Sequence, residues 1–373
     1  MKFTKILLTA IFAVALASGS GLAFHDAGVA DCQGCHTMHN SQDGALVDAA
    51  HPNGNAYLLN NGNSTDTCLG CHAAYGQFFG GLGYGPGGDF YWLTKTFTWT
   101  SHGHANESTG DSHGHNVYGP AYGLTFDATL GSAPGGDFLS TNLTCTSCHD
   151  PHGNESFRLL YGSALGPIYG GTRYDFVSNA PIAAGNSRRT YVGGGGNETD
   201  ARHTIHKSGM SLWCANCHET FHSPNTTKFV HPTGQNLGST VAAVYNAYVS
   251  SEDQDGGVQA TSYWGLVPFE AVNVDLETAD PTDYTLGPAG TDRVMCVTCH
   301  RAHASAFPDA GRWDFGAAFI NDESHPQDGD GGASVEDIAN KYYQYTFTDN
   351  QRSLCNKCHV KDAFDHMPYP VGP

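Results

Sequence analysis

The amino-acid sequence predicts a fold of mostly irregular coil and turns, with a few short helices and minimal strand. Two features of its composition support this prediction. The 47 glycines and 17 prolines among 373 residues favour loops, whereas 5 Trp, 18 Tyr and 19 Phe are too many for a disordered chain. The third observation is that all 12 cysteines fall into six copies of the pentapeptide Cys-x-x-Cys-His.

The six copies use every cysteine and place a histidine directly after each pair. The pairs are Cys32 and Cys35, Cys68 and Cys71, Cys145 and Cys148, Cys214 and Cys217, Cys296 and Cys299, and Cys355 and Cys358. The histidines that follow them are, in the same order, His36, His72, His149, His218, His300 and His359. We number these motifs one to six along the chain.

This spacing is the attachment signature of c-type haem. Two cysteines three residues apart lie on one turn, so both sulfurs can form thioethers with one porphyrin while the adjacent histidine ligates its iron. Zinc sites pair their Cys-x-x-Cys knuckles at short, regular distances, and thioredoxin-like chemistry uses one pair. A zinc or disulfide scaffold is thus the weaker alternative. We predict six haem c groups and a multihaem cytochrome c fold wrapped around a row of them.

The N-terminus has the pattern of a secretory signal peptide. Lys2 and Lys5 precede an apolar stretch from Ile6 to Ala17, and Gly21-Leu22-Ala23 offers small residues for cleavage. The predicted signal peptide is residues 1–23. Export agrees with the cysteine usage, because c-type haem is attached outside the cytoplasm, and we expect an extracellular, cell-surface or periplasmic protein.

The mature chain, residues 24–373, is predicted to be a single elongated hexahaem domain. It contains no apolar run long enough to span a bilayer. The whole chain has 17 Lys and Arg against 36 Asp and Glu, and the signal peptide removes two of the lysines. Such an acidic chain lacks the basic surface of a nucleic-acid-binding protein, so we expect no nucleic-acid partner.

Six of the remaining histidines are candidates for the second axial position of the irons. His39, His152, His222 and His303 lie just beyond a motif; held beside one haem, such a histidine reaches a neighbouring haem more readily than the far face of its own. His115 and His231 complete the set, and rivals for those two positions are His25, His51, His104, His113, His203, His206, His325 and His366. Histidine greatly outnumbers methionine, which predicts bis-histidine haems of low potential.

A few regular elements are also predicted. Apolar spacing indicates a helix over 240–250, Ser334 can cap a helix that runs to about Tyr345, and alternation favours a strand over 94–99. The string Pro-Gly-Gly-Asp-Phe occurs at 86–90 and again at 134–138, which indicates two similar turns, each followed by an aromatic ring that could cover a haem face.

Several strings resemble one known family. CQGCHTMHN, CTSCHDPHG, GMSLWCANCH, HPTGQN, CVTCHRAHAS and RSLCNKCH are similar to segments of the OmcS-type extracellular hexahaem cytochromes of metal-reducing bacteria. The resemblance runs from Phe24 to about Asp362. The loops 153–209 and 304–332 are shorter than in the best-known member, and a tail follows the sixth motif.

The resemblance implies that copies of the chain polymerise head to tail into a filament with bis-histidine haems. It also implies that His39 is donated to the fifth haem, that of Cys296, Cys299 and His300, in a neighbouring copy. The family's remaining second-position histidines match His115, His152, His231 and His303.

Electron transfer is the function that these features favour. Electrons would hop between closely spaced haems and pass to other cytochromes, or to extracellular acceptors such as metal oxides; a catalytic residue is not expected. Two alternatives remain open on the sequence: a multihaem oxyanion reductase with one open haem, and a monomeric periplasmic electron shuttle.

Overall fold

A computed structural model describes residues 32–73, 87–185, 204–221, 231–262, 266–279, 287–343 and 345–359. The predicted signal peptide, His25, His203, His222 and the tail with His366 lie outside these residues.

Within the described residues, regular structure is sparse. The helices are α2 (Ser64–His72), α3 (Met210–Cys214), α4 (Gly238–Ala247), α5 (Gln259–Ser262), α6 (Cys296–Cys299) and α7 (Val335–Asn340). The strands are β1 (Ser41–Gln42), β2 (Ala45–Leu46), β3 (Phe97–Ser101), β4 (His104–Ser108), β5 (Ile168–Tyr169), β6 (Thr172–Arg173), β7 (Ile182–Ala184) and β8 (Ile205–Ser208). They pair as four antiparallel two-stranded sheets, β1-β2, β3-β4, β5-β6 and β7-β8. The predicted class, irregular coil with short helices and little strand, is confirmed.

The predicted elements form with shifted boundaries. The expected helix at 240–250 is α4, which begins at Gly238 and ends at Ala247. Ser334 caps α7 as predicted, because its side chain accepts a hydrogen bond from the Asp337 amide. The prediction that this helix reaches Tyr345 is wrong: it ends at Asn340, and Tyr343 has a φ of 54°, which a helix excludes.

The strand predicted over 94–99 is also displaced. A 3₁₀ turn, η4 (Phe90–Thr94), occupies its start, and β3 begins at Phe97. The side chains of Phe97 and Trp92 are fully buried, so the aromatic residues here pack into the core from a turn and a strand. The alternation of apolar residues therefore correctly indicated burial, but the strand begins at Phe97 and not at residue 94.

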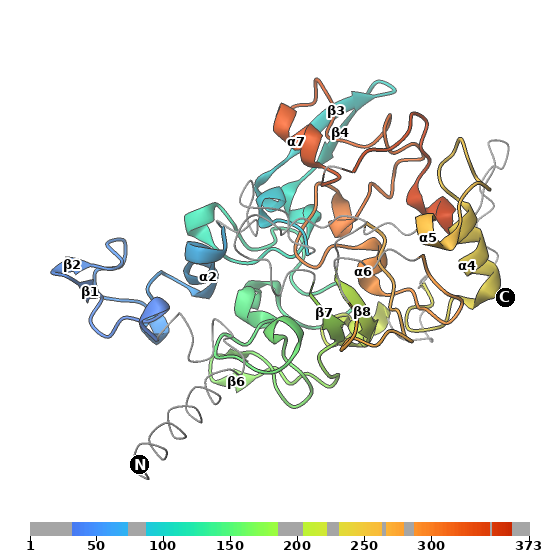
Figure 1. Cartoon of the computed structure of the whole chain (residues 1–373). Coiled ribbons are helices and arrows are strands. Elements are labelled where there is room, and N and C mark those ends of the chain that lie inside the picture. Colours follow the sequence, from blue (N-terminus) through green and yellow to red (C-terminus); the bar gives the residue numbers. More distant parts are fainter. Residues whose placement is uncertain are drawn as a thin grey trace, which may run out of the picture.

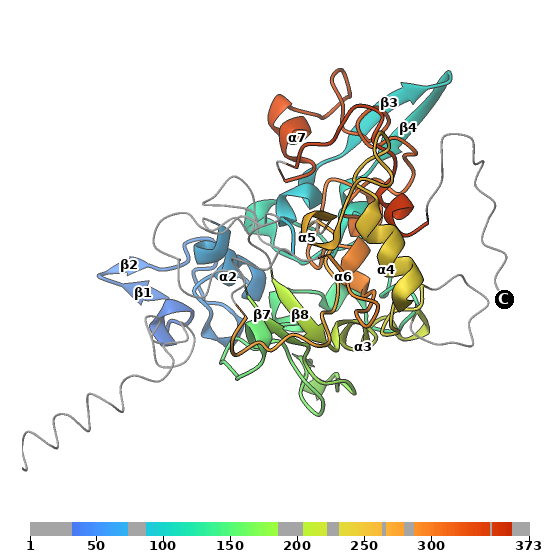
Figure 2. The same cartoon turned by 45° about the vertical axis from the view of Figure 1, so that its right-hand side comes forward.

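The main apolar cluster lies where segments far apart in the sequence meet. Trp92, Phe97, Tyr245, Leu266, Phe307, Trp313, Ile320 and Leu354 belong to it. A smaller cluster joins α2 to the segment around Val117 and Leu124. Figure 1 and Figure 2 show the β1-β2 hairpin at one edge of the molecule, apart from the other elements, while β3-β4 projects from the main body. Separate small clusters suit a protein whose interior is shared with large prosthetic groups.

Candidate functional site

Each Cys-x-x-Cys-His motif lies within or at the end of a short helical segment. The second motif is the last part of α2, and the cysteines of the fifth begin and end α6. The third motif begins with the 3₁₀ turn η8 (Cys145–Ser147), and the sixth overlaps the 3₁₀ turn η12 (Leu354–Lys357). In five motifs the histidine amide donates to the carbonyl of the first cysteine, over 2.8 to 3.1 Å. This i to i−4 bond brings both sulfurs and the imidazole to one turn, as covalent haem attachment requires.

The six motifs contact one another in their sequence order. The turn of the second motif packs on that of the third, and α3, which ends in the fourth motif, packs on α6. The thiol pKa values report the same neighbours. A hydrogen bond from Cys68 to the Cys145 sulfur raises the pKa of Cys68, and one from Cys214 to Cys296 acts likewise. All twelve cysteines are free, so the disulfide scaffold finds no support.

The other links in the row follow from neighbouring thiols. Burial, then the charges of Cys68 and Cys71, raise the pKa of Cys35. Burial and Cys217 raise the pKa of Cys148 to about 12. Burial, followed by the charges of the sixth-motif cysteines, raises the pKa of Cys299. The motifs therefore form one continuous row from first to sixth.

The imidazole rings are oriented by backbone carbonyls. Nδ1 lies 2.7 to 3.2 Å from a carbonyl oxygen in six of the predicted ligands, and the pairs are His36 with Tyr57, His115 with Ala302, His149 with Arg158, His218 with Pro134, His300 with Asp309 and His303 with Gly88. With Nδ1–H donating to a carbonyl, the lone pair is on Nε2, the nitrogen that binds a metal.

Four pairs of predicted ligands face each other across a gap. The ring centroids are 6.3 Å apart for His36 and His152, 6.3 Å for His149 and His303, 6.0 Å for His115 and His218, and 6.4 Å for His231 and His359. A ligating nitrogen lies about 2 Å from its metal and roughly 1.1 Å from its ring centre, so two axial rings of one iron have centroids about 6 Å apart. The four gaps therefore fit one haem iron each.

The electrostatics favour the ligating form of these rings. Burial lowers the pKa of His115 to about 4 and that of His303 to about 3, and it also lowers the pKa of His218 and His231. Each ring is therefore neutral at pH 7, as a metal ligand must be. Such rings suit a prosthetic group that accepts a lone pair from each side.

The first, third and fifth motifs are structural copies of one another. Each packs against a 3₁₀ turn whose middle residue has a positive φ: 56° at Tyr57 in η2 (Ala56–Leu58), 50° at Arg158 in η9 (Phe157–Leu159) and 58° at Asp309 in η11 (Pro308–Ala310). That residue's carbonyl accepts the bond from the motif histidine. In each copy, the backbone amide of the residue after the histidine donates to the carbonyl of the last residue of the turn, over 2.7, 2.7 and 2.6 Å. Sequence reasoning missed this repeat, although each copy has the string Cys-His-x-x-His.

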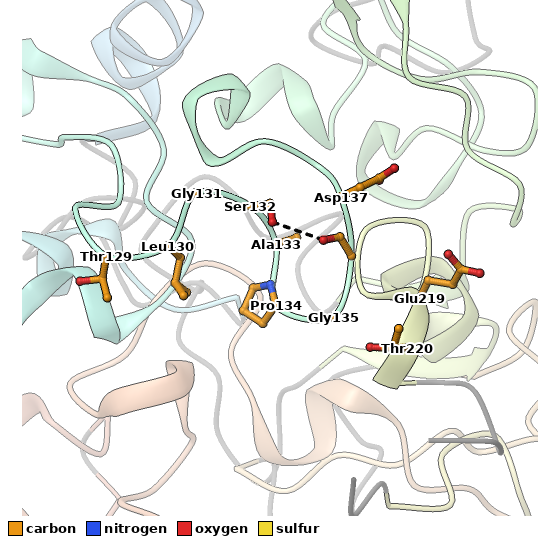
Figure 3. Close-up of a pocket in the computed structure, with 11 residues that line it drawn as sticks. Thr129, Leu130, Gly131, Ser132, Ala133, Pro134, Gly135, Asp137, Glu219 and Thr220 are labelled. Carbon is orange, nitrogen blue, oxygen red and sulfur yellow. Dashed lines mark hydrogen bonds between the residues drawn. The ribbon is translucent and has the colours of Figure 1, made fainter. Parts of the chain in front are cut away.

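The two Pro-Gly-Gly-Asp-Phe strings orient ligand rings. The Gly88 carbonyl of the first string accepts from His303, whose ring stacks on Phe90 at 4.6 Å. The Pro134 carbonyl of the second accepts from His218, and its loop lines a hollow of about 540 Å³ beside the fourth motif (Figure 3). Phe90 therefore covers a ligand ring, and the prediction that the aromatic of each string covers a haem face stays a prediction.

The rival histidines have other contacts. Both ring nitrogens of His113 are engaged, with Trp92 and Ser108. His51 pairs with Asp48, and His325 pairs with Asp330. Of the remaining predicted ligands, His39 is exposed in the segment before β1, and His222 lies outside the described residues. These two, like the full ligand set, stay predictions.

A row of haem-attachment turns with paired imidazoles defines the class of protein: a multihaem c-type cytochrome. Comparison with known proteins specifies the family. The chain is 34% identical over 440 residues to the C-type cytochrome OmcS of Geobacter sulfurreducens. The match covers 97% of this chain and the whole of the relative. The chain therefore belongs to the OmcS family of c-type cytochromes.

Solved structures give the same result. The chain resembles the cryo-EM structure of OmcS nanowires from Geobacter sulfurreducens with a TM-score of 0.77 and 31% identity, over 91% of this chain and the whole of that one. A second structure, of the outer membrane cytochrome S filament from the same organism, matches with the same score and coverage at 33% identity. No family model matches the chain. None of the helices in the described parts of the chain has the length and apolarity to cross a bilayer.

Proposed function

We propose that the chain, exported and folded as one elongated domain over residues 24–373, binds six haem c groups and conducts electrons along them. The observation that carries this proposal is the pairing of imidazole rings across gaps of 6.0 to 6.4 Å beside a continuous row of attachment turns. When bound, haem supplies one-electron chemistry, and the chain supplies its spacing, burial and ligands.

The ring pairs support the following proposal for four irons. His36 and His152 serve the first motif, His149 and His303 the third, His218 and His115 the fourth, and His359 and His231 the sixth. Two of these assignments follow one rule. The histidine downstream of the third motif serves the first, and the one downstream of the fifth serves the third, so each is donated two motifs back.

The same rule supports an inter-subunit ligand for the fifth motif. By this rule, the ring opposite His300 would come from two motifs beyond the fifth. That position lies one motif past the sixth and is therefore the first motif of the next copy. The first motif is a structural copy of the third and fifth, and its downstream histidine, His39, is exposed. The His300 ring packs against Phe315, with centroids 5.3 Å apart, and the three histidines that interact with it electrostatically, His115, His218 and His231, belong to the proposed fourth and sixth sites. We therefore assign His39 of the next copy to the fifth haem, and the relatives' filament structures support head-to-tail assembly.

The second motif is assigned by the same rule. The histidine downstream of the fourth motif is His222, two motifs beyond His72. We propose that His222 ligates the iron attached at Cys68 and Cys71, which completes six bis-histidine sites.

Filling both axial positions suits electron transfer better than catalysis. A reductase needs an iron with an open position, whereas the chain provides a histidine for each of twelve positions. We propose an extracellular or cell-surface filament that takes electrons from other cytochromes and delivers them to external acceptors such as metal oxides. A non-polymerising periplasmic shuttle is the second candidate, favoured only by the tail that follows the sixth motif.

Two measurements test this function. Mass spectrometry of the unfolded mature protein should find six covalent porphyrins, and electron paramagnetic resonance of the oxidised filament should show low-spin ferric iron only. Fewer porphyrins, or a high-spin signal at full occupancy, would contradict the bis-histidine electron carrier and favour a reductase.

A substitution separates the filament from the shuttle. His39→Ala should abolish filaments in electron micrographs and turn the fifth haem high-spin, while the protomer keeps six porphyrins. His104→Ala, at an exposed histidine in β4, is the matched control and should assemble normally. Intact filaments in His39→Ala would refute the donated ligand.

A further inference from the structure

Charged residues adjoining the six motifs change sign along the row. Asp150 and Glu219 directly follow the histidines of the third and fourth motifs. Arg301 follows that of the fifth motif, and Lys357 lies between the two cysteines of the sixth. The chain has no Lys or Arg between Lys5 and Lys95, so the first two motifs have no basic residue nearby in sequence.

Lys357 is held inside the protein. Its side chain is 0% exposed. Nζ donates to the Tyr248 carbonyl and lies 4.3 Å from the Tyr245 ring centroid and 5.6 Å from that of Tyr248. A carbonyl oxygen and two aromatic faces are groups that stabilise an ammonium ion away from water. This contact set fixes a positive charge within the sixth attachment turn.

The fifth motif has a mixture of charges. Arg312, 3% exposed, donates from Nε to the carbonyls of Val297 and His300, inside the motif itself. Two buried carboxylates oppose the cations here: Glu270 acts on Cys296, and Asp89 lies with Arg301 beside the Tyr343 ring. The positive charge at the fifth site is therefore partly offset.

The fourth and sixth motifs have charges of opposite sign beside them. Beside the fourth motif, the Tyr174 hydroxyl lies 2.9 Å from a carboxylate oxygen of Asp137 and 3.0 Å from the Asn216 carbonyl oxygen, which belongs to the motif itself. At the sixth motif, the buried Lys357 ammonium lies within the attachment turn. The electrostatic environment thus passes from negative at the fourth motif, through mixed, to positive at the sixth.

Charge near a haem changes its affinity for an electron. Reduction of a ferric bis-histidine site adds one electron and lowers the charge of the site by one, with no bond or proton exchanged. A buried cation therefore favours the reduced form, and a carboxylate favours the oxidised form. Resting on the proposed function, we propose that Lys357 makes the sixth haem the highest-potential site of the protomer, so that a single electron resides at the C-terminal end of the row.

Spectroelectrochemical titration of the full holoprotein tests the inference. In Lys357→Met, one sixth of the absorbance change, the part reduced at the highest potential, should move to lower potential. At fixed potential the reduced-to-oxidised ratio of that site should fall about tenfold, which corresponds to about 59 mV for a one-electron couple. A curve that matches the wild type at all potentials would overturn the proposal.

Lys341→Met is the matched control. Lys341 is also a buried lysine, 8% exposed, but it donates to the carbonyls of Ser324 and Pro326. Its removal tests the loss of a buried lysine elsewhere in the same part of the fold. The titration curve of this variant should match the wild type, and an equal shift would show that the effect is not specific to the sixth motif.

If Lys357→Met fails to bind its sixth haem, a second variant tests which haem has the highest potential. Replacing Cys355 and Cys358 by alanine removes the sixth porphyrin, and mass spectrometry reports that loss. The remaining five sites should then lack the highest-potential component. Loss of an intermediate or low-potential component would refute the assignment, whereas fewer than six porphyrins in the wild type would refute the proposed function instead.

Discussion

The odd-numbered and even-numbered motifs share a pentapeptide but are supported differently. In the first, third and fifth motifs, the histidine bonds to a carbonyl only 21, 9 and 9 residues away, in a turn that belongs to the same unit. In the fourth motif, the corresponding carbonyl, that of Pro134, is 84 residues away. The odd sites are local modules, and the fourth site depends on tertiary structure for the same bond.

The difference shows how one chain can combine repeated local haem-attachment units with sites that depend on distant segments. A local module can be repeated along an axis, and under the proposed assignment each odd module would donate a histidine backwards to the previous one. The histidines of the fourth and sixth motifs instead face the rings of His115 and His231, which precede them by long intervening segments. The proposed ligands of the fourth and sixth motifs would therefore tie distant parts of the protomer together.

The largest expected effect comes from removing a donated ring inside the protomer. His303→Ala should leave the third haem with one axial ligand, giving a high-spin ferric signal and a protomer of lower stability. The ring also stacks on Phe90 and bonds to Gly88, so its loss opens a cavity as well. Paramagnetic resonance and thermal unfolding measure both effects.

Two further variants complete that comparison. His152→Ala should open the first haem in the same way, because His152 faces His36. His113→Ala removes a buried histidine whose nitrogens bond to Trp92 and Ser108, so it should destabilise the fold without any high-spin signal. A low-spin spectrum in His303→Ala would break the rule of donation two motifs back.

The second prediction concerns the even sites. A Cβ added to Gly136 would lie 1.8 Å from the Cys217 carbonyl oxygen, so Gly136→Ala must displace the loop that carries Pro134 away from His218. Overpacking of this kind costs about 1–3 kcal/mol. Denaturant unfolding should show that loss. Gly131→Ala, in the same loop with nothing within 4 Å of its added Cβ, should change stability little.

The sequence predicted the attachment turns and their number but not this division. Spacing alone identifies Cys68 to His72 as a haem turn, because its chemistry is local. Pairing His115 with His218 requires the fold, since no short-range pattern links them. The turn at Tyr57 was equally hidden, because a positive φ in a residue other than glycine has no sequence signal. His39 and His222 were proposed because each follows a motif closely, and both stay predictions.

A third prediction tests the local turns of the odd motifs. Asp309 has a φ of 58°, a conformation that a β-branched residue strongly disfavours. Asp309→Val should therefore destabilise the protein by about 1–2 kcal/mol. Glu219→Val, at an exposed residue beside the fourth motif, should stay within about 0.5 kcal/mol. Equal melting temperatures for the two variants would contradict the local character of the odd modules.

The smallest effect is a contrast in acid sensitivity between the first two motifs. A hydrogen bond from Asn55 lowers the pKa of Asp48, beside the first motif, whereas burial raises the pKa of Asp66 in α2, beside the second. A lowered carboxyl pKa gives stability that is present above the unfolded-state value and lost as pH falls through the folded-state value. A raised one gives stability that is present below the unfolded-state value and lost as pH rises through the folded-state value.

Acidification from pH 5 to pH 3 should therefore weaken the segment of Asp48 and strengthen that of Asp66. Amide-exchange protection factors of residues 40–55 and 64–73 measure each segment separately. Asp48→Asn should remove the acid loss in the first segment only, and Asp66→Asn should remove the acid gain in the second only, because neither amide titrates in this range. The same pH response in both segments would mean that global unfolding, and not the two local environments, governs acid sensitivity here.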